Sequence, residues 1–151
     1  MKTKETKRRN FLLLALVAAS MAGCTFENGT EIETAEFTVY RRDWQWNSDY
    51  NRFECIMDYP ELGTGIYRDG TVLGAVYILE SDGNGEYEVL KTLPFTESLP
   101  YNNRSYTKTM SFDIAPRQIT FYIQSSDLSS DEGDLGTYTF KITLIWERDS
   151  R

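Results

Sequence analysis

The sequence gathers its aromatic side chains most densely between residues 40 and 50. This segment of eleven residues contains Tyr40, Trp44, Trp46 and Tyr50. Trp44 and Trp46 are two positions apart, so in an extended chain they point to the same side. Aromatic faces can stack against sugar rings, and we therefore predict a ligand-binding platform formed by Trp44, Trp46 and Tyr50. The alternative is that these rings fill one end of a hydrophobic core, because aromatic side chains dominate core burial.

Two acidic segments carry the oxygen ligands that calcium prefers. In one of them acids alternate with an amide, at Asp82, Asn84, Glu86 and Glu88. An EF-hand loop needs Gly where Tyr87 stands and a bidentate Glu where Leu93 stands, so a metal-free hairpin turn explains this segment. The other segment is a loop that could fold around one calcium ion or remain solvated, with the candidate ligands Asp127, Asp131, Glu132 and Asp134.

The chain contains no His. This composition excludes a Ser-His-Asp triad, a Cys-His pair and every His-ligated zinc or iron site. Cys55 alternates with Phe53 and Met57, which predicts a small buried apolar side chain rather than a reactive thiol. We therefore expect no enzyme activity, and a hydrolase that uses Asp and Glu alone is the least favoured of the alternatives.

The first 23 residues have the organisation of a secretory signal peptide. Five basic residues and one acid precede an apolar run from Phe11 to Ala19, and small residues follow it. The apolar run is shorter than the roughly 20 residues that a membrane-spanning helix needs. We predict residues 1–23 as a cleaved signal peptide; an uncleaved signal anchor is an alternative.

The residues at the predicted cut, Met21-Ala22-Gly23-Cys24, resemble a bacterial lipobox. The resemblance implies a diacylglyceryl thioether on Cys24, cleavage before it, and acylation of the new amino terminus with palmitate-type chains. Several acyl chains would make the membrane attachment long-lived. The alternative is an ordinary signal peptide that carries a Cys at the cut.

Cleavage before Cys24 changes the net charge from −7 to −11. Such acidity argues against nucleic acid as a partner, since phosphate contacts need clustered Lys and Arg. Residues 24–35 are polar and acidic, which predicts a flexible tether after the lipidated Cys24. The domain is expected over residues 36–147, followed by a tail over residues 148–151.

From Glu36 onward, apolar and polar residues alternate between turn signals. The alternation is cleanest over residues 118–125 and 137–147. Residues 71–80 form an apolar run, which predicts a strand buried on both faces, and residues 81–85 predict a hairpin turn. Pro94 and Pro100 are expected to bracket a loop. About seven strands predict a single antiparallel β-sandwich, immunoglobulin-like or jelly-roll-like.

Five short motifs carry a resemblance to a protein group. They are Trp44-Gln45-Trp46-Asn47, Tyr67-Arg68-Asp69-Gly70-Thr71-Val72-Leu73, Leu93-Pro94-Phe95-Thr96, Ile119-Thr120-Phe121-Tyr122 and Phe140-Lys141-Ile142-Thr143. In this order they resemble small envelope lipoproteins of gut and oral Bacteroidetes. The resemblance implies one β-sandwich anchored to the outer membrane, and it implies no activity and no functional residue beyond Cys24.

Together these observations predict a non-catalytic binding or adhesion module for glycan or protein, attached to the cell envelope by lipid. One alternative is a structural accessory subunit of an envelope complex. An exposed aromatic patch flanked by polar residues would favour the glycan module. An open sheet edge or an apolar patch would favour the accessory subunit.

Overall fold

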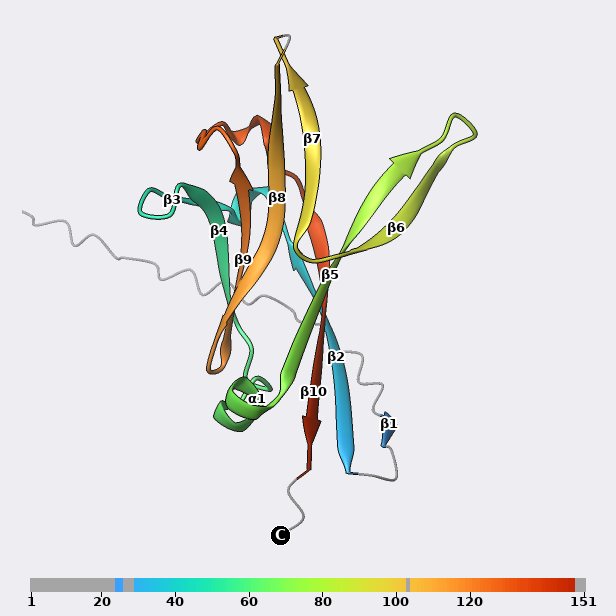
Figure 1. The fold of residues 1–151 in the computed structure, drawn as a ribbon, viewed down its shortest axis with the longest axis vertical. Coiled ribbons are helices and arrows are strands. Elements are labelled where there is room, and N and C mark those ends of the chain that lie inside the picture. Colours follow the sequence, from blue (N-terminus) through green and yellow to red (C-terminus); the bar gives the residue numbers. More distant parts are fainter. Residues whose placement is uncertain (1–23, 26–28, 103, 149–151) are drawn as a thin grey trace, which may run out of the picture.

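The computed structural model describes residues 24–25, 29–102 and 104–148 (Figure 1). The elements in these ranges are β1 (Cys24–Thr25), β2 (Thr30–Val39), η1 (Arg41–Asp43), β3 (Gln45–Asn47), β4 (Arg52–Asp58), α1 (Thr64–Asp69), β5 (Thr71–Ser81), β6 (Glu86–Thr92), β7 (Phe95–Tyr101), β8 (Arg104–Ala115), β9 (Gln118–Ser125), η2 (Glu132–Asp134) and β10 (Tyr138–Glu147). The predicted signal peptide, residues 1–23, and residues 149–151 of the predicted tail lie outside the described residues.

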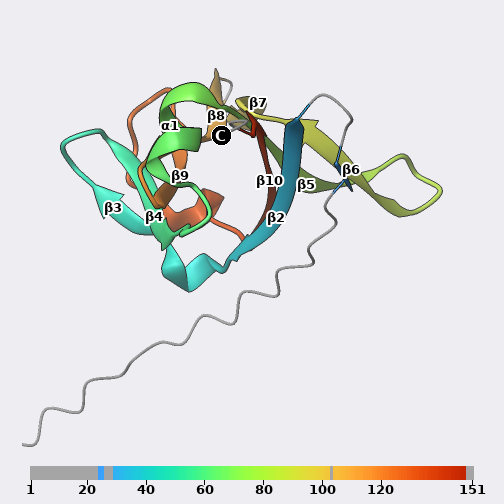
Figure 2. The same cartoon turned by 90° about the horizontal axis from the view of Figure 1, so that it is seen from below.

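Two antiparallel sheets make up the domain, which confirms the predicted all-β sandwich. The strand orders are β1-β2-β10-β5-β6 and β3-β4-β9-β8-β7. The early strand β2 pairs with the last strand β10 along the full length of both, from Thr30 opposite Glu147 to Val39 opposite Tyr138. Viewed from below, the two sheets curve around a common core, and the β5–β6 hairpin extends away from it (Figure 2).

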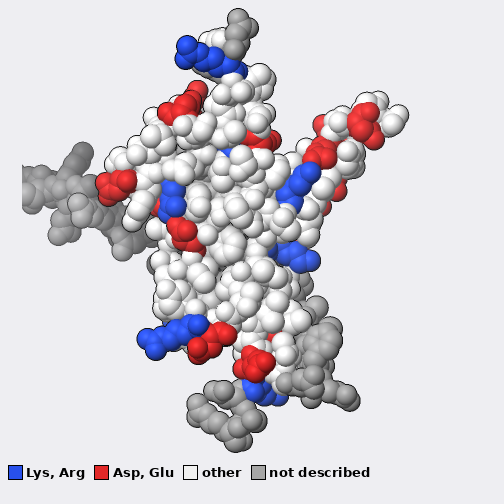
Figure 3. Space-filling view, in the orientation of Figure 1, with Lys and Arg blue, Asp and Glu red and all other residues white. Residues whose placement is uncertain are grey.

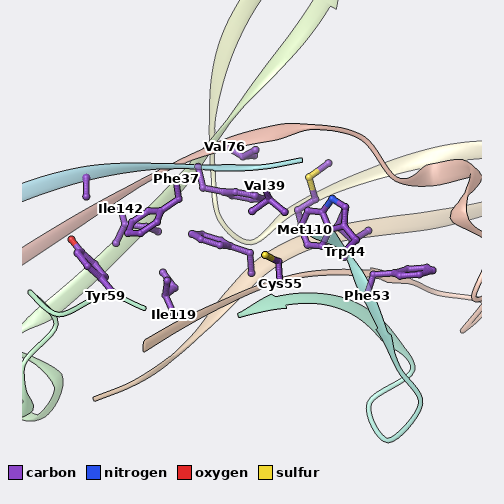
Figure 4. Close-up of a cluster of buried hydrophobic side chains, with 14 of the residues drawn as sticks. Phe37, Val39, Trp44, Phe53, Cys55, Tyr59, Val76, Met110, Ile119 and Ile142 are labelled. Carbon is purple, nitrogen blue, oxygen red and sulfur yellow. The ribbon is translucent and has the colours of Figure 1, made fainter. Parts of the chain in front are cut away.

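The core lies between the inner faces of the two sheets (Figure 4). Along β9 and β10 every second side chain is buried, as the alternation predicts: Ile119, Phe121, Ile123, Phe140, Ile142 and Leu144. The rings of Phe121 and Phe140 stack across the two sheets with 4.2 Å between their centroids. Burial of these alternating faces is the main force that holds the sheets together.

Strand β5 differs from the prediction that both of its faces are buried. Val76 on the inner face is fully buried, but Leu73 and Leu79 on the outer face are 54% and 69% exposed. The outer face of this sheet carries no covering layer among the described residues, so one side of the apolar run faces solvent. Gly74 lies on the inner side, where a β-carbon would overlap the ring of Phe112.

The predicted boundaries need two corrections. Residues 30–35 are not a flexible tether, because β2 begins at Thr30 and hydrogen-bonds to β10, which places Ala35 in the core. The segment between Pro94 and Pro100 is not a loop but strand β7, which pairs with β8. Because β7 is the last strand of its sheet, Pro100, which lacks an N–H, is tolerated there.

Candidate functional site

Trp44, the first residue of the predicted aromatic platform, lies in the core. Its side chain is buried, and its Nε1 donates a 2.9 Å hydrogen bond to the carbonyl oxygen of Gly136. Its ring meets Tyr138 and Phe140 edge to face. Trp44 therefore plugs one end of the sandwich, which is the alternative that the sequence left open, and it cannot offer its face to a sugar.

Trp46 and Tyr50 lie in different environments, one partly buried and the other exposed. Trp46 on β3 is partly buried and packs edge to face against Phe53 of β4, with 5.0 Å between ring centroids. Tyr50 lies in the turn between β3 and β4 and is 61% exposed. The structure therefore does not bring Trp44, Trp46 and Tyr50 together in one platform, and only Tyr50 offers a largely exposed ring.

Tyr50 instead belongs to a cluster centred on Arg52, which sequence reasoning missed. The Arg52 side chain donates 2.6 Å hydrogen bonds to Glu54 through Nε and to Asp113 through Nη2. Its guanidinium lies 4.1 Å from the ring centroid of Tyr122 and 4.9 Å from that of Tyr50. Burial acts to lower the pKa of Arg52, but the hydrogen bonds to Asp113 and Glu54 outweigh it and raise the pKa.

The carboxylates of this cluster are committed to structural contacts. Glu54 is buried, and its Oε2, the oxygen that Arg52 does not contact, accepts a 2.9 Å hydrogen bond from the Asn47 side chain. The Asp113 side chain is 55% exposed, but its Oδ2 accepts the hydrogen bond from Arg52. Both acids are held by hydrogen bonds from the Arg52 guanidinium, which gives them a structural role in this cluster. What the cluster offers to solvent is the Tyr50 ring and the Asp113 carboxylate, which both contact the same Arg52 guanidinium.

A second exposed surface lies on the β5–β6 hairpin, which we call the arm and define as residues 77–92. Both views show the arm projecting from the sandwich (Figures 1 and 2). Its turn has the predicted hairpin chemistry, since Asp82 Oδ1 accepts a hydrogen bond from the Asn84 N–H and Gly83 has φ +85°. Three large apolar side chains of the arm are at least 44% exposed: Leu79, Tyr87 and Leu90.

The predicted calcium ligands do not gather among the described residues. In the described part of the chain no three Asp, Glu or Cys side chains lie together in a way that could hold a metal ion. Asp127 accepts a hydrogen bond from the Ser129 N–H and Asp131 from the Gly133 N–H, so both shape their own loop. Glu132 is exposed, and the side chain of Asp134 lies outside the description.

The two cysteines have different positions. Cys55 is buried between the sheets, and burial raises the pKa of its thiol to about 11, which agrees with the predicted unreactive side chain. The backbone of Cys24 opens β1 and pairs with Ile32, but its side chain is outside the description. Within the described ranges, no helix reaches the length and apolar character needed to cross a membrane.

Comparison of the chain with protein-family models, with curated proteins and with solved structures gave no match. The structure thus places the chain as a single all-β domain of two antiparallel sheets, without a relative that identifies it. Arguments about its function therefore rest on the side chains of the Arg52 cluster and the arm.

Proposed function

We propose that this chain is a lipid-anchored protein of the bacterial cell envelope whose sandwich is a non-catalytic binding domain, and that its arm contacts a protein partner. The observation that carries the proposal is the exposure of Leu79, Tyr87 and Leu90 on one projecting hairpin. Leu79 and Leu90 lie on the outer face of this hairpin and Tyr87 lies on its inner face. Contiguous exposed apolar side chains mark interaction sites in soluble domains. Ile78 is the residue of the arm that packs against the core, so the arm adds little to it, and a partner contact is a reason for the arm's length.

The anchor in this proposal is the lipobox at Cys24 behind a basic and apolar leader. Cys55 is buried in the core, which supports lipid rather than a disulfide as the fate of Cys24. Because the backbone of Cys24 pairs with Ile32, acyl chains on Cys24 would hold the first sheet directly at the bilayer surface. We assign the chain to the outer membrane, as the resemblance to Bacteroidetes lipoproteins implies.

A photo-crosslinking residue placed at Leu79 in the full chain tests the proposal in living cells. The matched control is the same residue at Ile56, which is 61% exposed on the outer face of the other sheet. We expect a crosslinked product of one defined mass from position 79 and none from position 56. The absence of a product from position 79, or equal products from both positions, contradicts the proposal.

A glycan ligand at the Arg52 cluster is the second candidate, and the observation that favours it is the exposed Tyr50 ring and the exposed Asp113 carboxylate, which contact the same guanidinium. An aromatic face beside a hydrogen-bonding carboxylate suits a sugar. A glycan array probed with the full chain, with Tyr50→Ala and with the control Ile56→Ala tests this candidate. We expect a glycan signal that Tyr50→Ala removes and Ile56→Ala retains. No signal, or equal loss in both variants, contradicts it.

A further inference from the structure

Strand β6 is the last strand of its sheet in the part of the chain that the structure describes. It pairs with β5 on one side, from Ala75 opposite Thr92 to Ser81 opposite Glu86. The ribbon view shows β6 on the side of the arm that is turned away from the β7–β8 hairpin (Figure 1), and the space-filling view shows the arm standing clear of the rest of the described chain on that side (Figure 3). The backbone of β6 is therefore accessible along the edge that faces away from β5.

The hydrogen-bond alternation of an antiparallel ladder identifies the backbone groups at that edge. The Leu93 N–H donates a 2.9 Å hydrogen bond to the carbonyl of Gly74, the residue directly opposite in the same register. Alternate residues therefore bond to β5, and the intervening ones direct their N–H and C=O groups outward. The outward set is Glu86, Glu88, Leu90 and Thr92.

The side chains that border this edge differ between its two faces. Glu86, Glu88 and Leu90 share the outer face with Leu79, whereas Tyr87 and Val89 share the inner face with Ile78. The arm carries four acids and one base, a net charge of −3. That base, Lys91, is already paired with Glu80 at 2.5 Å. An incoming strand therefore meets Glu86 and Glu88 on the outer face of β6, and Tyr87 and Val89 on its inner face.

We propose that β6 accepts an additional strand from a partner protein, with Lys or Arg at alternate positions and apolar residues between them. The basic residues lie beside Glu86 and Glu88, and the apolar residues cover Tyr87 and Val89. Main-chain hydrogen bonds to an open edge supply affinity in this mode, and the alternate side chains supply specificity. This inference rests on the proposed function and names the chemistry of the partner.

Charge decides against a second copy of the chain as the occupant. Two arms would bring together two surfaces of net charge −3, and Lys91 is not free to offset them. Like charges on neighbouring strands destabilise their pairing. The other long edge, β7, contains Pro100, which has no N–H to donate. The acids on β6 thus discourage self-pairing and select a basic strand.

The probe is a blocked seven-residue peptide of alternating Lys and Val, added to the full chain in detergent. Amide hydrogen exchange reports the site. We expect the peptide to slow hydrogen exchange at the amides of Glu88 and Leu90. Exchange in β7 (Phe95–Tyr101), the internal reference, should not change. A Glu/Val peptide and a Lys/Val peptide with a central Pro are the controls, and neither should bind. Equal binding of the acidic peptide, or no binding of the basic one, overturns the inference.

The double variant E86K/E88K provides the charge test, and T96K/S98K on exposed positions of β7 is its matched control. We expect the Lys/Val peptide to bind about tenfold more weakly to E86K/E88K, from two reversed cross-strand pairs, and the Glu/Val peptide to bind more tightly. The control variant should bind like the parent chain. Unchanged affinity in E86K/E88K overturns the inference, as does concentration-dependent dimerisation with protection at β6.

Crosslinking from Leu79 separates this inference from the function on which it rests. If the product from position 79 persists in E86K/E88K cells, the arm contacts a partner without the strand addition, and the inference alone is wrong. If the parent chain gives no product, the proposed function fails first. Loss of the product in E86K/E88K with its retention in T96K/S98K supports both.

Discussion

Glu97 and Lys108 face each other directly across the β7–β8 ladder, and their charged groups are 2.6 Å apart although the Lys108 side chain is only 8% exposed. The Lys108 ammonium also donates a 3.3 Å hydrogen bond to the Tyr138 hydroxyl on the opposite sheet. Burial acts to lower the pKa of Lys108, but the hydrogen bond to Glu97 and the interaction with Tyr138 outweigh it and raise the pKa. Lys108 is thus a buried charge whose counter-charge comes from the neighbouring strand.

We expect Glu97→Gln to destabilise the domain by about 2 kcal/mol, because it leaves the buried ammonium without its counter-charge. The full cost of breaking a buried pair is about 3–5 kcal/mol, and the partial exposure of Glu97 reduces it. Lys108→Met should be nearly neutral, because it removes the buried charge altogether. Urea unfolding of both variants measures the difference. A larger loss for Lys108→Met than for Glu97→Gln contradicts this account of the pair.

The same pair should respond to alkaline pH. A raised folded-state pKa means that Lys108 contributes stability below its ordinary pKa of 10.5, and that this contribution is lost as pH rises through the folded-state value. The free energy of unfolding of the parent chain should therefore fall more steeply above pH 10 than that of Lys108→Met. Parallel curves for the two proteins would show that the ion pair contributes no stability.

Tyr59 is a buried phenol whose hydroxyl has no hydrogen-bond partner among the described residues. Its ring packs edge to face on Phe37, with 5.0 Å between the centroids. Tyr59→Phe keeps the ring and removes the unsatisfied group, so we expect about 1 kcal/mol of added stability. Tyr59→Ala, the contrasting variant, should lose about 3–5 kcal/mol through the cavity it leaves. Thermal unfolding compares the two variants. A Tyr59→Phe variant that is less stable than the parent chain would show that the hydroxyl stabilises the fold and would contradict the prediction.

Glu33 should make the domain more stable in mild acid than at neutral pH. Burial and the nearby charge of Glu61 raise the pKa of Glu33 above its ordinary 4.5. The folded state therefore binds this proton more tightly than the unfolded state, and the gain is lost as pH rises through the folded-state pKa. Glu33→Gln should raise the free energy of unfolding at pH 7 and flatten its dependence between pH 4 and 7. Glu31→Gln, on the same strand, is the control and should retain that dependence.

The sequence predicts the parts of this fold that follow from local alternation. Strands β9 and β10 alternate strictly, and burial of one face by the opposite sheet confirms both. The hairpin at Asp82–Gly85 follows equally from its residues, because Asp, Asn and Gly suit the turn on their own. These features depend on neighbours in the chain and are therefore readable without tertiary contacts.

The errors fall where tertiary contacts decide the structure. Residues 30–35 are polar enough for a tether, but each of them pairs in register with a residue of β10, and Ala35 is small enough to enter the core. Pro100 argues against a central strand, and only the sheet order shows that β7 lies at an edge. The apolar run of β5 indicates a hydrophobic strand, but it does not indicate that the outer sheet face is uncovered, which leaves Leu73 and Leu79 exposed to solvent.

The candidate site was less predictable than the fold. Trp44 and Trp46 have the residue type of a sugar platform, yet the packing of Trp44 on Tyr138 and Phe140 uses residues almost a hundred positions away. The Arg52 cluster likewise joins Arg52 to Asp113, which are 61 residues apart. The alternation of Arg52 and Glu54 was the only local signal, and it matches any exposed strand face.

Membrane attachment through Cys24 is the prediction that bears most directly on the proposed function. Replacing Cys24 by Ala removes the sulfur atom that would carry the lipobox thioether, so we expect the chain to move from the membrane fraction to the soluble fraction and to lose incorporated labelled palmitate. Cys55→Ala is the matched control and should remain in the membrane fraction, because its thiol is buried in the core. Several acyl chains bind a bilayer far more tightly than one, so the shift should be nearly complete rather than partial. A Cys24→Ala chain that stays with the membrane would show that the leader remains as an uncleaved anchor. Equal release of both variants would instead point to a folding defect.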